Sequence, residues 1–231
     1  MNSKRRTPLT RDQVLRAALK LADASHGSFQ SLSMRKIAAK LGVEAMSLYN
    51  HVANKEDIVD GLVDIVFSEI DVPDPGSMDW KPAMRRRAIS VRAALNRHRW
   101  AVGLMEGRMH PGPANVRNHD AVMGCLREGG FAFRDAVHAY SVMDAYIYGF
   151  ALQEKGLPFD VPEETADVMR RQSETVPSMA DYPYLVETAA ELEKGGYDYE
   201  TEFLFGLDLI LEGLERFQLS RSAGSAGGAP A

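Results

Sequence analysis

The spacing of the apolar residues constrains this chain more than any other feature, because apolar positions recur every three to four residues along nearly its whole length. That period places apolar side chains on one face of an α-helix, whereas a half-buried strand alternates apolar and polar residues. One short segment, for example, has its apolar residues at Met34, Ile37, Ala38 and Leu41. The sequence contains no alternating strand pattern and no internal repeat, so it predicts an all-α protein of about ten helices.

Capping residues mark where several of these helices begin. Thr10 and Gln13 have the spacing of a capping box. Ser33 and Asn54 are typical N-cap residues for a second and a fourth helix, and Gly42 is placed to end the second. The predicted helices are Thr10–Ala24, Ser33–Leu41, Glu44–Val52, Asn54–Ile70, Trp80–Arg97, Arg99–Glu106, Ala114–Glu128, Phe133–Lys155, Pro162–Glu174, Tyr182–Lys194 and Tyr199–Leu219.

A segment with two prolines and a glycine, Asp71–Asp79, is the strongest linker candidate in the first half of the chain. It separates an N-terminal helix-turn-helix domain, residues 1–55, and a connecting helix, residues 56–71, from a larger helical domain, residues 72–219. We call residues 1–55 the head and residues 72–219 the body. Residues 220–231 are small and of low complexity, which predicts a disordered tail.

Charge is distributed unevenly between these parts. The chain of 231 residues has a net charge of −5, but the head has ten Lys and Arg against three Asp and Glu, a net charge of +7, so the remainder carries −12. This asymmetry is typical of a protein whose head alone approaches a polyanion. It also fits a helical protein whose solvated charges happen to cluster.

Cysteine content and hydropathy exclude several classes of protein. The single cysteine, Cys125, excludes a disulfide framework and a multi-cysteine metal site, and it is typical of the reducing cytoplasm. No apolar run approaches the roughly 18 residues of a membrane helix, and no signal peptide is visible. These features predict a cytoplasmic protein that makes no contact with a membrane.

The two short helices Ser33–Leu41 and Glu44–Val52, joined by a tight turn, have the pattern of a helix-turn-helix. Its small apolar core is expected to consist of Leu41, Val43, Leu48 and Val52, with the last two turned inward. The small residues that open the second helix would let it approach the DNA major groove closely. Arg35 could reach a guanine edge or a phosphate, and Lys55 is placed for a phosphate at the start of the following helix. Alternative roles remain open. A tyrosine such as Tyr49 in a helix is more often a packing residue that also exposes its hydroxyl, Met34 fits the apolar stripe of the core, and His51 could cap or pack.

The same segment resembles the DNA-binding head of the TetR (tetracycline repressor) family. The resemblance is carried by LTRDQVLRAALKLAD, by LSMRKIAAKLGVEAMSLYNHVANKEDIVDGL and above all by LYxHVxNK at Leu48–Lys55. It continues in the body at REGGF (Arg127–Phe131) and FLFGLDLILEGLE (Phe203–Glu215). The resemblance implies contact with a DNA operator through Ser33, Met34, Arg35, Ala45, Met46, Ser47, Tyr49, Asn50, His51 and Lys55.

Two departures from the tetracycline repressors bear on what this chain recognises. Those repressors have Gln-Pro in place of Ala45-Met46 and Trp in place of Asn50, which implies a different operator sequence. They also have histidines that contact the drug or its magnesium where this chain has Met105 and Asp71. A thioether does not suit magnesium, so the expected effector needs no metal and is apolar or aromatic.

The closing helix, Tyr199–Leu219, is apolar almost all round and must be covered on more than one side. This predicts a homodimer in which Leu207 or Leu211 faces the second subunit, although a central helix of a monomer would look similar. The family resemblance implies that this helix and Phe133–Lys155 form a four-helix bundle between two subunits.

A stripe of methionines and aromatic residues in the body predicts an effector cavity, although such a stripe also fits plain core. The histidines have no metal-ligand spacing, and no nucleophile–base pair, carboxylate pair or phosphate loop predicts an enzyme. The sequence therefore predicts a transcriptional regulator, with no cofactor, that a small molecule releases from double-stranded DNA. A DNA-binding dimer without an effector is the main alternative. The predicted effector contacts are Trp100, Leu104, Met105, Met109, Met123, Asp144 and Tyr148, with Met143, Tyr146 and Phe150 beside them.

Overall fold

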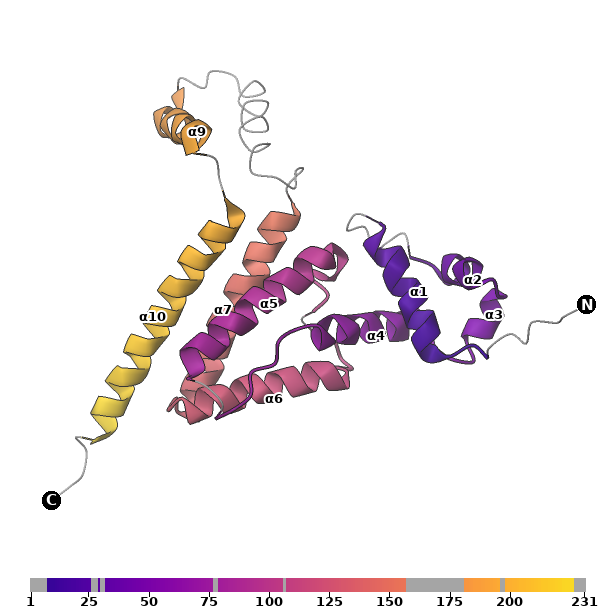
Figure 1. Ribbon diagram of the computed structural model, residues 1–231, viewed down its shortest axis with the longest axis horizontal. Helices are drawn as coiled ribbons and strands as arrows, with labels where there is room; N and C mark the ends of the chain where they lie inside the picture. Colours follow the sequence, from indigo (N-terminus) through magenta and orange to yellow (C-terminus); the bar gives the residue numbers. More distant parts are fainter. Residues whose placement is uncertain are drawn as a thin grey trace, which may run out of the picture.

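The computed structural model describes residues 8–25, 29, 32–76, 79–105, 107–156, 181–195 and 198–226. Over these residues it has nine α-helices, one short 3-10 turn and no strand, as the apolar periodicity predicts (Figure 1). No helix in these ranges is long and apolar enough to cross a membrane. The elements are α1 (Arg11–Asp23), α2 (Met34–Leu41), α3 (Ala45–Leu48), α4 (Lys55–Ser68), α5 (Trp80–Arg97), the 3-10 turn η2 (Arg99–Ala101), α6 (Pro113–Glu128), α7 (Phe133–Lys155), α9 (Pro183–Gly195) and α10 (Tyr199–Ala226).

The helices of the head begin and end where the capping residues predict. The Thr10 hydroxyl accepts from the Gln13 backbone N–H at 3.2 Å, and the Gln13 side chain accepts from the Thr10 N–H at 3.0 Å, which completes the capping box. Gly42 ends α2 in the left-handed conformation, with φ of 66°. A side chain at Gly61 would meet Leu15 at 2.8 Å, so this glycine is what lets α4 approach α1 closely.

The body is built around α5, which packs against α6, α7 and α10, while α4 reaches from the head to pack on α6 (Figure 1). Trp80 at the start of α5 meets Phe131 edge-on, with ring centroids 4.9 Å apart. Gly129 lies directly against the Trp80 side chain, where a Cβ would come within 2.6 Å. Helix α9 stands apart from the rest of the body in Figure 1, and its described side chains are almost all exposed.

The long helices α7 and α10 lie side by side, and their apolar residues divide into two sets. On α10, Phe203, Leu207 and Leu211 are buried within the chain, whereas Phe205 and Leu209 are exposed. The prediction that Leu207 or Leu211 faces a second subunit is therefore wrong. Both leucines face the chain's own core. Residues four positions apart, such as Leu207 and Leu211, share one side of the helix, and Phe205 and Leu209 share another side.

Two predicted helices differ from the structure, and a third prediction is not covered by it. The predicted helix Arg99–Glu106 is only the 3-10 turn η2, followed by turns in which Gly103 has φ of 87°, a conformation that ends a helix. The predicted helix Glu44–Val52 is shorter: α3 stops at Leu48, although Leu48 and Val52 both point inward as predicted. The predicted helix 162–174 lies outside the described residues.

The tail was predicted to be disordered from Ser220, but α10 continues to Ala226. Its extension is held by a long-range contact, since the Arg221 guanidinium lies 3.3 Å from the Asp135 carboxylate of α7. The Ser220 hydroxyl also donates to the Phe217 carbonyl at 2.7 Å. Low sequence complexity gives no information about contacts of this kind, which explains the error; residues 227–231 lie outside the described ranges.

Candidate functional site

The second helix of the helix-turn-helix, α3, has one buried face and one exposed face. Leu48 is completely buried, and Val52 is 2% exposed just beyond the helix. On the other side Met46 is 75% exposed and Tyr49 48% exposed. The burial of one face therefore holds α3 on the head and presents the opposite face to a large partner, which is the arrangement that entry into a major groove requires.

The remaining predicted contacts of α3 and its flanks are less prominent. Asn50 is exposed, whereas Ala45, Ser47 and His51 are partly buried. The Ser47 hydroxyl donates to the Glu44 carbonyl at 2.6 Å, so it stabilises the start of α3. DNA contact by these four residues stays a prediction.

The first turn of α2 contributes Ser33, Met34 and Arg35. The Ser33 hydroxyl caps the helix by accepting from the Lys36 N–H at 3.3 Å. Met34 packs against the core of the head, which supports the alternative role expected for it, and Arg35 is exposed. Arg35 is therefore the side chain of this turn that is best placed to reach outward.

The start of α4 is fixed by a small network around Asp57. The Asn54 side chain accepts from the Asp57 N–H at 2.9 Å, the Asp57 carboxylate accepts from the Ala53 N–H at 2.8 Å, and Arg11 of α1 pairs with the same carboxylate. The Lys55 ammonium lies 5.5 Å from the centre of the Phe29 ring, a cation–π contact that restrains the predicted phosphate-binding side chain.

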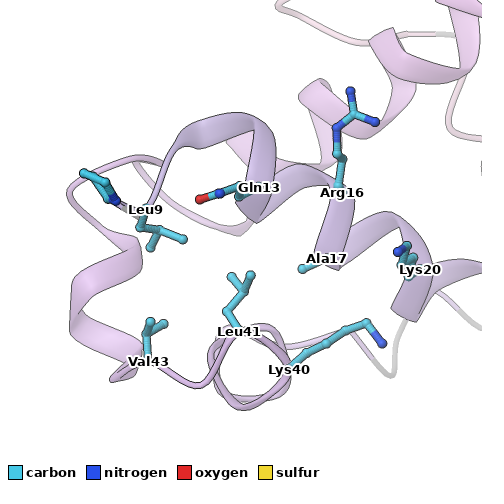
Figure 2. A pocket seen from close by; sticks show the side chains of 9 residues that line it. Leu9, Gln13, Arg16, Ala17, Lys20, Lys40, Leu41 and Val43 are labelled. Atoms are coloured by element: carbon cyan, nitrogen blue, oxygen red, sulfur yellow. The ribbon is translucent and has the colours of Figure 1, made fainter. Parts of the chain in front are cut away.

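A groove of about 660 Å³ runs along the head between α1 and the α2–α3 turn (Figure 2). Lys20 and Lys40 lie at one end of it, and Leu9 and Val43 lie at the other. None of the predicted DNA contacts lines this groove, so it is separate from the exposed face of α3. It also explains why Leu41 and Val43, expected in the core of the head, are only partly buried.

Head and body meet at a polar cluster around His98, the residue that follows α5. His98 Nδ1 lies 2.8 Å from Asp23 Oδ1 at the end of α1, and His98 Nε2 lies 3.2 Å from Glu69 Oε1 at the end of α4. The Trp100 indole N–H donates to Asp23 at 2.7 Å, and Arg97 donates to Glu69 at 2.8 Å. Three elements that are distant in the sequence are thus joined through one buried imidazole.

This cluster shifts the acidity of Glu69. Partial burial favours the neutral acid, but hydrogen bonds from Arg97 and His98, with their positive charge, outweigh it, so the pKa of Glu69 lies below its ordinary value. A second contact joins the body to α4: Arg108 donates to Asp60 at 2.6 Å and to Glu56 at 3.0 Å. The connecting helix is therefore held to the body by ion pairs as well as by its apolar face.

Deep in the body lies an ion pair that the sequence reasoning missed. The Arg87 guanidinium donates to the Asp144 carboxylate at 2.8 and 3.4 Å, and Arg87 Nε donates to the Asn118 side-chain oxygen at 3.2 Å. Arg87, Asp144 and Asn118 are 2%, 6% and 1% exposed. Burial disfavours the charge, but Asp144 outweighs this effect and holds the pKa of Arg87 above its ordinary value. Among the described residues, nothing accepts a hydrogen bond from Asn118 Nδ2.

The predicted effector contacts do not form one group. Met105 is buried in the core of the body, but Met109 is 89% exposed and does not join it. Trp100 lies at the junction with the head, where its ring contacts Phe29 and His98, and Asp144 is occupied by Arg87. Leu104, Met123 and Tyr148 are partly buried.

Two further cavities open on the body, but neither is lined by a predicted effector contact. One, of about 500 Å³, lies beside Trp80 and Cys125, and the other, of about 550 Å³, lies along α5 from Pro82 to Ala93. Burial and nearby Glu128 raise the pKa of the Cys125 thiol, which leaves it protonated and a poor ligand. Over the described ranges, no three His, Cys, Asp or Glu side chains are grouped to hold a metal ion.

Comparison with known proteins agrees with this arrangement over nearly the whole chain. Residues 14–62 match the family profile of bacterial regulatory proteins of the tetR family, and residues 72–217 match that of the tetracyclin repressor-like C-terminal domain. The HTH-type transcriptional repressor DrrR1 of Streptomyces coeruleorubidus is 31% identical over 225 residues, which cover 94% of this chain and 82% of that one.

Other relatives extend the likeness to tetracycline repressors and to solved structures. The class D tetracycline repressor of Escherichia coli is 31% identical over 213 residues, covering 90% of this chain and 89% of the repressor. The structure of Streptomyces coelicolor ActR in complex with actinorhodin superposes with a TM-score of 0.75 at 27% identity, covering 92% of this chain and 99% of ActR. The chain therefore belongs to the TetR family of transcriptional regulators, whose members are not enzymes.

Proposed function

We propose that this protein is a cytoplasmic repressor that binds a palindromic operator as a homodimer and is released by a small apolar or aromatic effector. The observation that carries the proposal is the exposed face of α3 on a head with a net charge of +7. Tyr49 and Met46 extend from that face, and Arg35 and Lys55 flank it. This combination supplies both base contacts and phosphate contacts.

Operator binding can be tested by selecting duplexes from random DNA and measuring the affinity of variants by fluorescence anisotropy. Arg35→Ala and Tyr49→Ala are each expected to weaken binding by about 1–3 kcal/mol if they contact base edges. Lys55→Ala is expected to weaken binding to all sequences alike and to reduce the salt dependence by about one unit of slope. Wild-type affinity in all three variants would show that this set of contacts is wrong.

Dimer formation is supported by the apolar residues that α7 and α10 leave uncovered. Phe133 on α7 is 69% exposed, and on α10 Phe205 is 63% and Leu209 53% exposed. Exposed apolar patches of this kind mark interaction surfaces. A two-fold dimer would place its two heads on half-sites about 34–36 Å apart, which is one turn of DNA.

The dimer can be tested by sedimentation of Phe205→Glu and Leu209→Glu. Both side chains are exposed in the single chain, so each variant is expected to fold yet to dissociate, because a buried subunit interface would have to accept an unpaired charge. Val116→Glu is the matched control, since Val116 is 54% exposed on α6, away from this surface. A folded wild-type monomer at micromolar concentration would contradict the proposal.

The effector is proposed to bind in the body, near the buried layer that contains Met105 and Met143. The Asn118 amide, whose oxygen accepts from the Arg87 that pairs with Asp144, has a donor that no described residue satisfies, which favours an aromatic ligand carrying a carbonyl or similar acceptor. The complex of ActR with actinorhodin shows a small-molecule ligand in a related chain. A DNA-binding dimer without an effector remains the alternative.

The effector can be sought by screening planar aromatic compounds for release of the protein from its operator. Anthraquinone and anthracene form a matched pair, since their shapes are alike but only the first has acceptor oxygens. Release is expected to be unaffected by EDTA and to be blocked by Met143→Trp, which would fill the site. Magnesium-dependent release by tetracycline would show that the inference from Met105 is wrong.

A further inference from the structure

His98 has a carboxylate on each of its two ring nitrogens, and the two carboxylates belong to different parts of the molecule. Asp23 is the last residue of α1 in the head, and Glu69 follows α4, the helix that connects head and body. The distances are 2.8 Å from Nδ1 to Asp23 and 3.2 Å from Nε2 to Glu69. His98 itself belongs to the body and its side chain is only 8% exposed.

The chemistry of this arrangement depends on the charge of the imidazole. An ionised carboxylate only accepts hydrogen bonds, so both contacts need a proton on both ring nitrogens. A neutral imidazole has one N–H and would turn a lone pair toward the other carboxylate. Because the ring is nearly buried, water cannot easily replace the lost bond. The complete bridge therefore exists only in the imidazolium form.

A second cation at this cluster is Arg97, which lies on α5. It donates to Oε2 of Glu69, whereas His98 contacts Oε1. Glu69 thus keeps one partner when His98 loses its proton. Asp23 keeps the Trp100 indole N–H, a neutral donor that also comes from the body. Of these two cations, Arg97 contacts only the carboxylate at the end of α4, whereas the imidazolium contacts the carboxylates at the ends of both α1 and α4.

Helix α1 is held at its other end by Arg11, which pairs with Asp57 at the start of α4. The head packs on α4 along its apolar face, and its hydrogen bonds to the body run through Asp23, beside the ring contact of Phe29 with Trp100. Any change in the Asp23 contact is therefore transmitted to α1, and through the core of the head to α2 and α3. This junction therefore acts on the orientation of the head together with the packing of α4 on the body.

We propose that His98 is a positioning residue for DNA binding. As an imidazolium it joins Asp23 to Glu69 and holds the head at a fixed angle to the body, and loss of its proton weakens operator binding. This inference rests on the proposed binding of an operator by the head.

The test uses the full-length protein and an operator duplex selected with it, at constant ionic strength. As the pH is raised, the wild-type affinity for the operator is expected to fall by at least about fivefold more than the affinity of His98→Gln. His110→Gln is the matched control, because His110 is an exposed loop histidine and the variant removes one imidazole away from this junction. This control is expected to keep the wild-type pH profile.

A second variant keeps the test decisive if His98→Gln fails to fold, which circular dichroism would reveal. Asp23→Asn preserves the shape of the side chain at the end of α1 but removes one of the two carboxylates, so it is also expected to flatten the profile. Profiles of both variants that run parallel to the wild type, or an affinity that rises with pH, would overturn the inference while leaving operator binding intact. Failure to select any operator would instead overturn the proposed function, and this inference with it.

Discussion

The head and the body place their polar side chains in opposite ways. In the head, Tyr49 is 48% exposed and Arg35 is exposed on short helices that rest on an apolar core. In the body, Arg87 and Asp144 are 2% and 6% exposed and pair with each other inside the core. The surface of the head can therefore change its sequence preference without loss of stability, whereas a polar change in the body alters stability and any ligand site together.

The largest effect is expected from breaking the buried pair. Asp144→Ala leaves the Arg87 guanidinium buried without its carboxylate and is expected to cost about 3–5 kcal/mol, measured by urea unfolding. The double variant Arg87→Met/Asp144→Leu removes both charges and is expected to recover most of that loss. A loss of stability below about 1 kcal/mol in Asp144→Ala would mean that the pair is solvated. The body would then expose its charged side chains to water as the head does.

Two neighbouring residues of the head allow a buried side chain to be compared with an exposed one. Leu48→Ala removes a completely buried side chain and is expected to cost about 2–5 kcal/mol of stability. Tyr49→Ala removes an exposed one and is expected to change stability by no more than about 0.5 kcal/mol while weakening DNA binding. Thermal unfolding of both variants separates the two roles. Equal destabilisation would show that Tyr49 is a packing residue after all.

A smaller loss of stability is expected from a substitution of the N-cap residue of α4. Asn54→Ala removes the side chain that accepts from the Asp57 N–H and is expected to cost about 1 kcal/mol. Asn54→Asp is the matched control, since a carboxylate caps a helix equally well. Chemical denaturation of the two variants gives the difference directly, and an Asn54→Asp variant as unstable as Asn54→Ala would mean that something other than capping is lost.

The smallest change in stability is expected for Glu69→Gln, and its size depends on pH. Because the pKa of Glu69 is lowered in the folded protein, its contribution to stability is present above the ordinary pKa and is lost as pH falls through the folded value. The stability difference between wild type and Glu69→Gln is therefore expected to shrink between about pH 5 and about pH 3. A difference that stays constant over this range would show that the bonds from Arg97 and His98 do not favour the ionised form.

Local features of the fold could be predicted from the sequence because they depend on neighbouring residues. Helix α5 and helix α7 have the predicted bounds, and the caps at Thr10, Ser33 and Asn54 are all present. The all-α class and the helix-turn-helix also follow from spacing. Each of these depends on interactions within a few positions along the chain, which is the range that periodicity and capping rules describe.

What could not be predicted depends on which side of a helix faces the rest of the chain. Arg87 belongs to a run of three arginines, and nothing in that run indicates that this one turns inward to meet Asp144, 57 positions away. In the same way, Leu207 and Leu209 are both leucines of α10, yet the first is buried and the second exposed. The pairing of Arg221 with Asp135 is a long-range contact of the same kind, in the part of α10 that continues to Ala226.

The two-ended attachment of α1 has a geometric consequence for recognition. The helix has 13 residues, or about 20 Å at about 1.5 Å per residue. A shift of about 1 Å at Asp23, taken about the end held by Arg11, rotates the helix by about 3°. In the proposed two-fold dimer each head would turn by this angle in the opposite sense, so the angle between the two DNA-binding faces would change by about 6°. A displacement shorter than a hydrogen bond at one end of α1 would therefore act on DNA as a change in the angle between two half-site contacts.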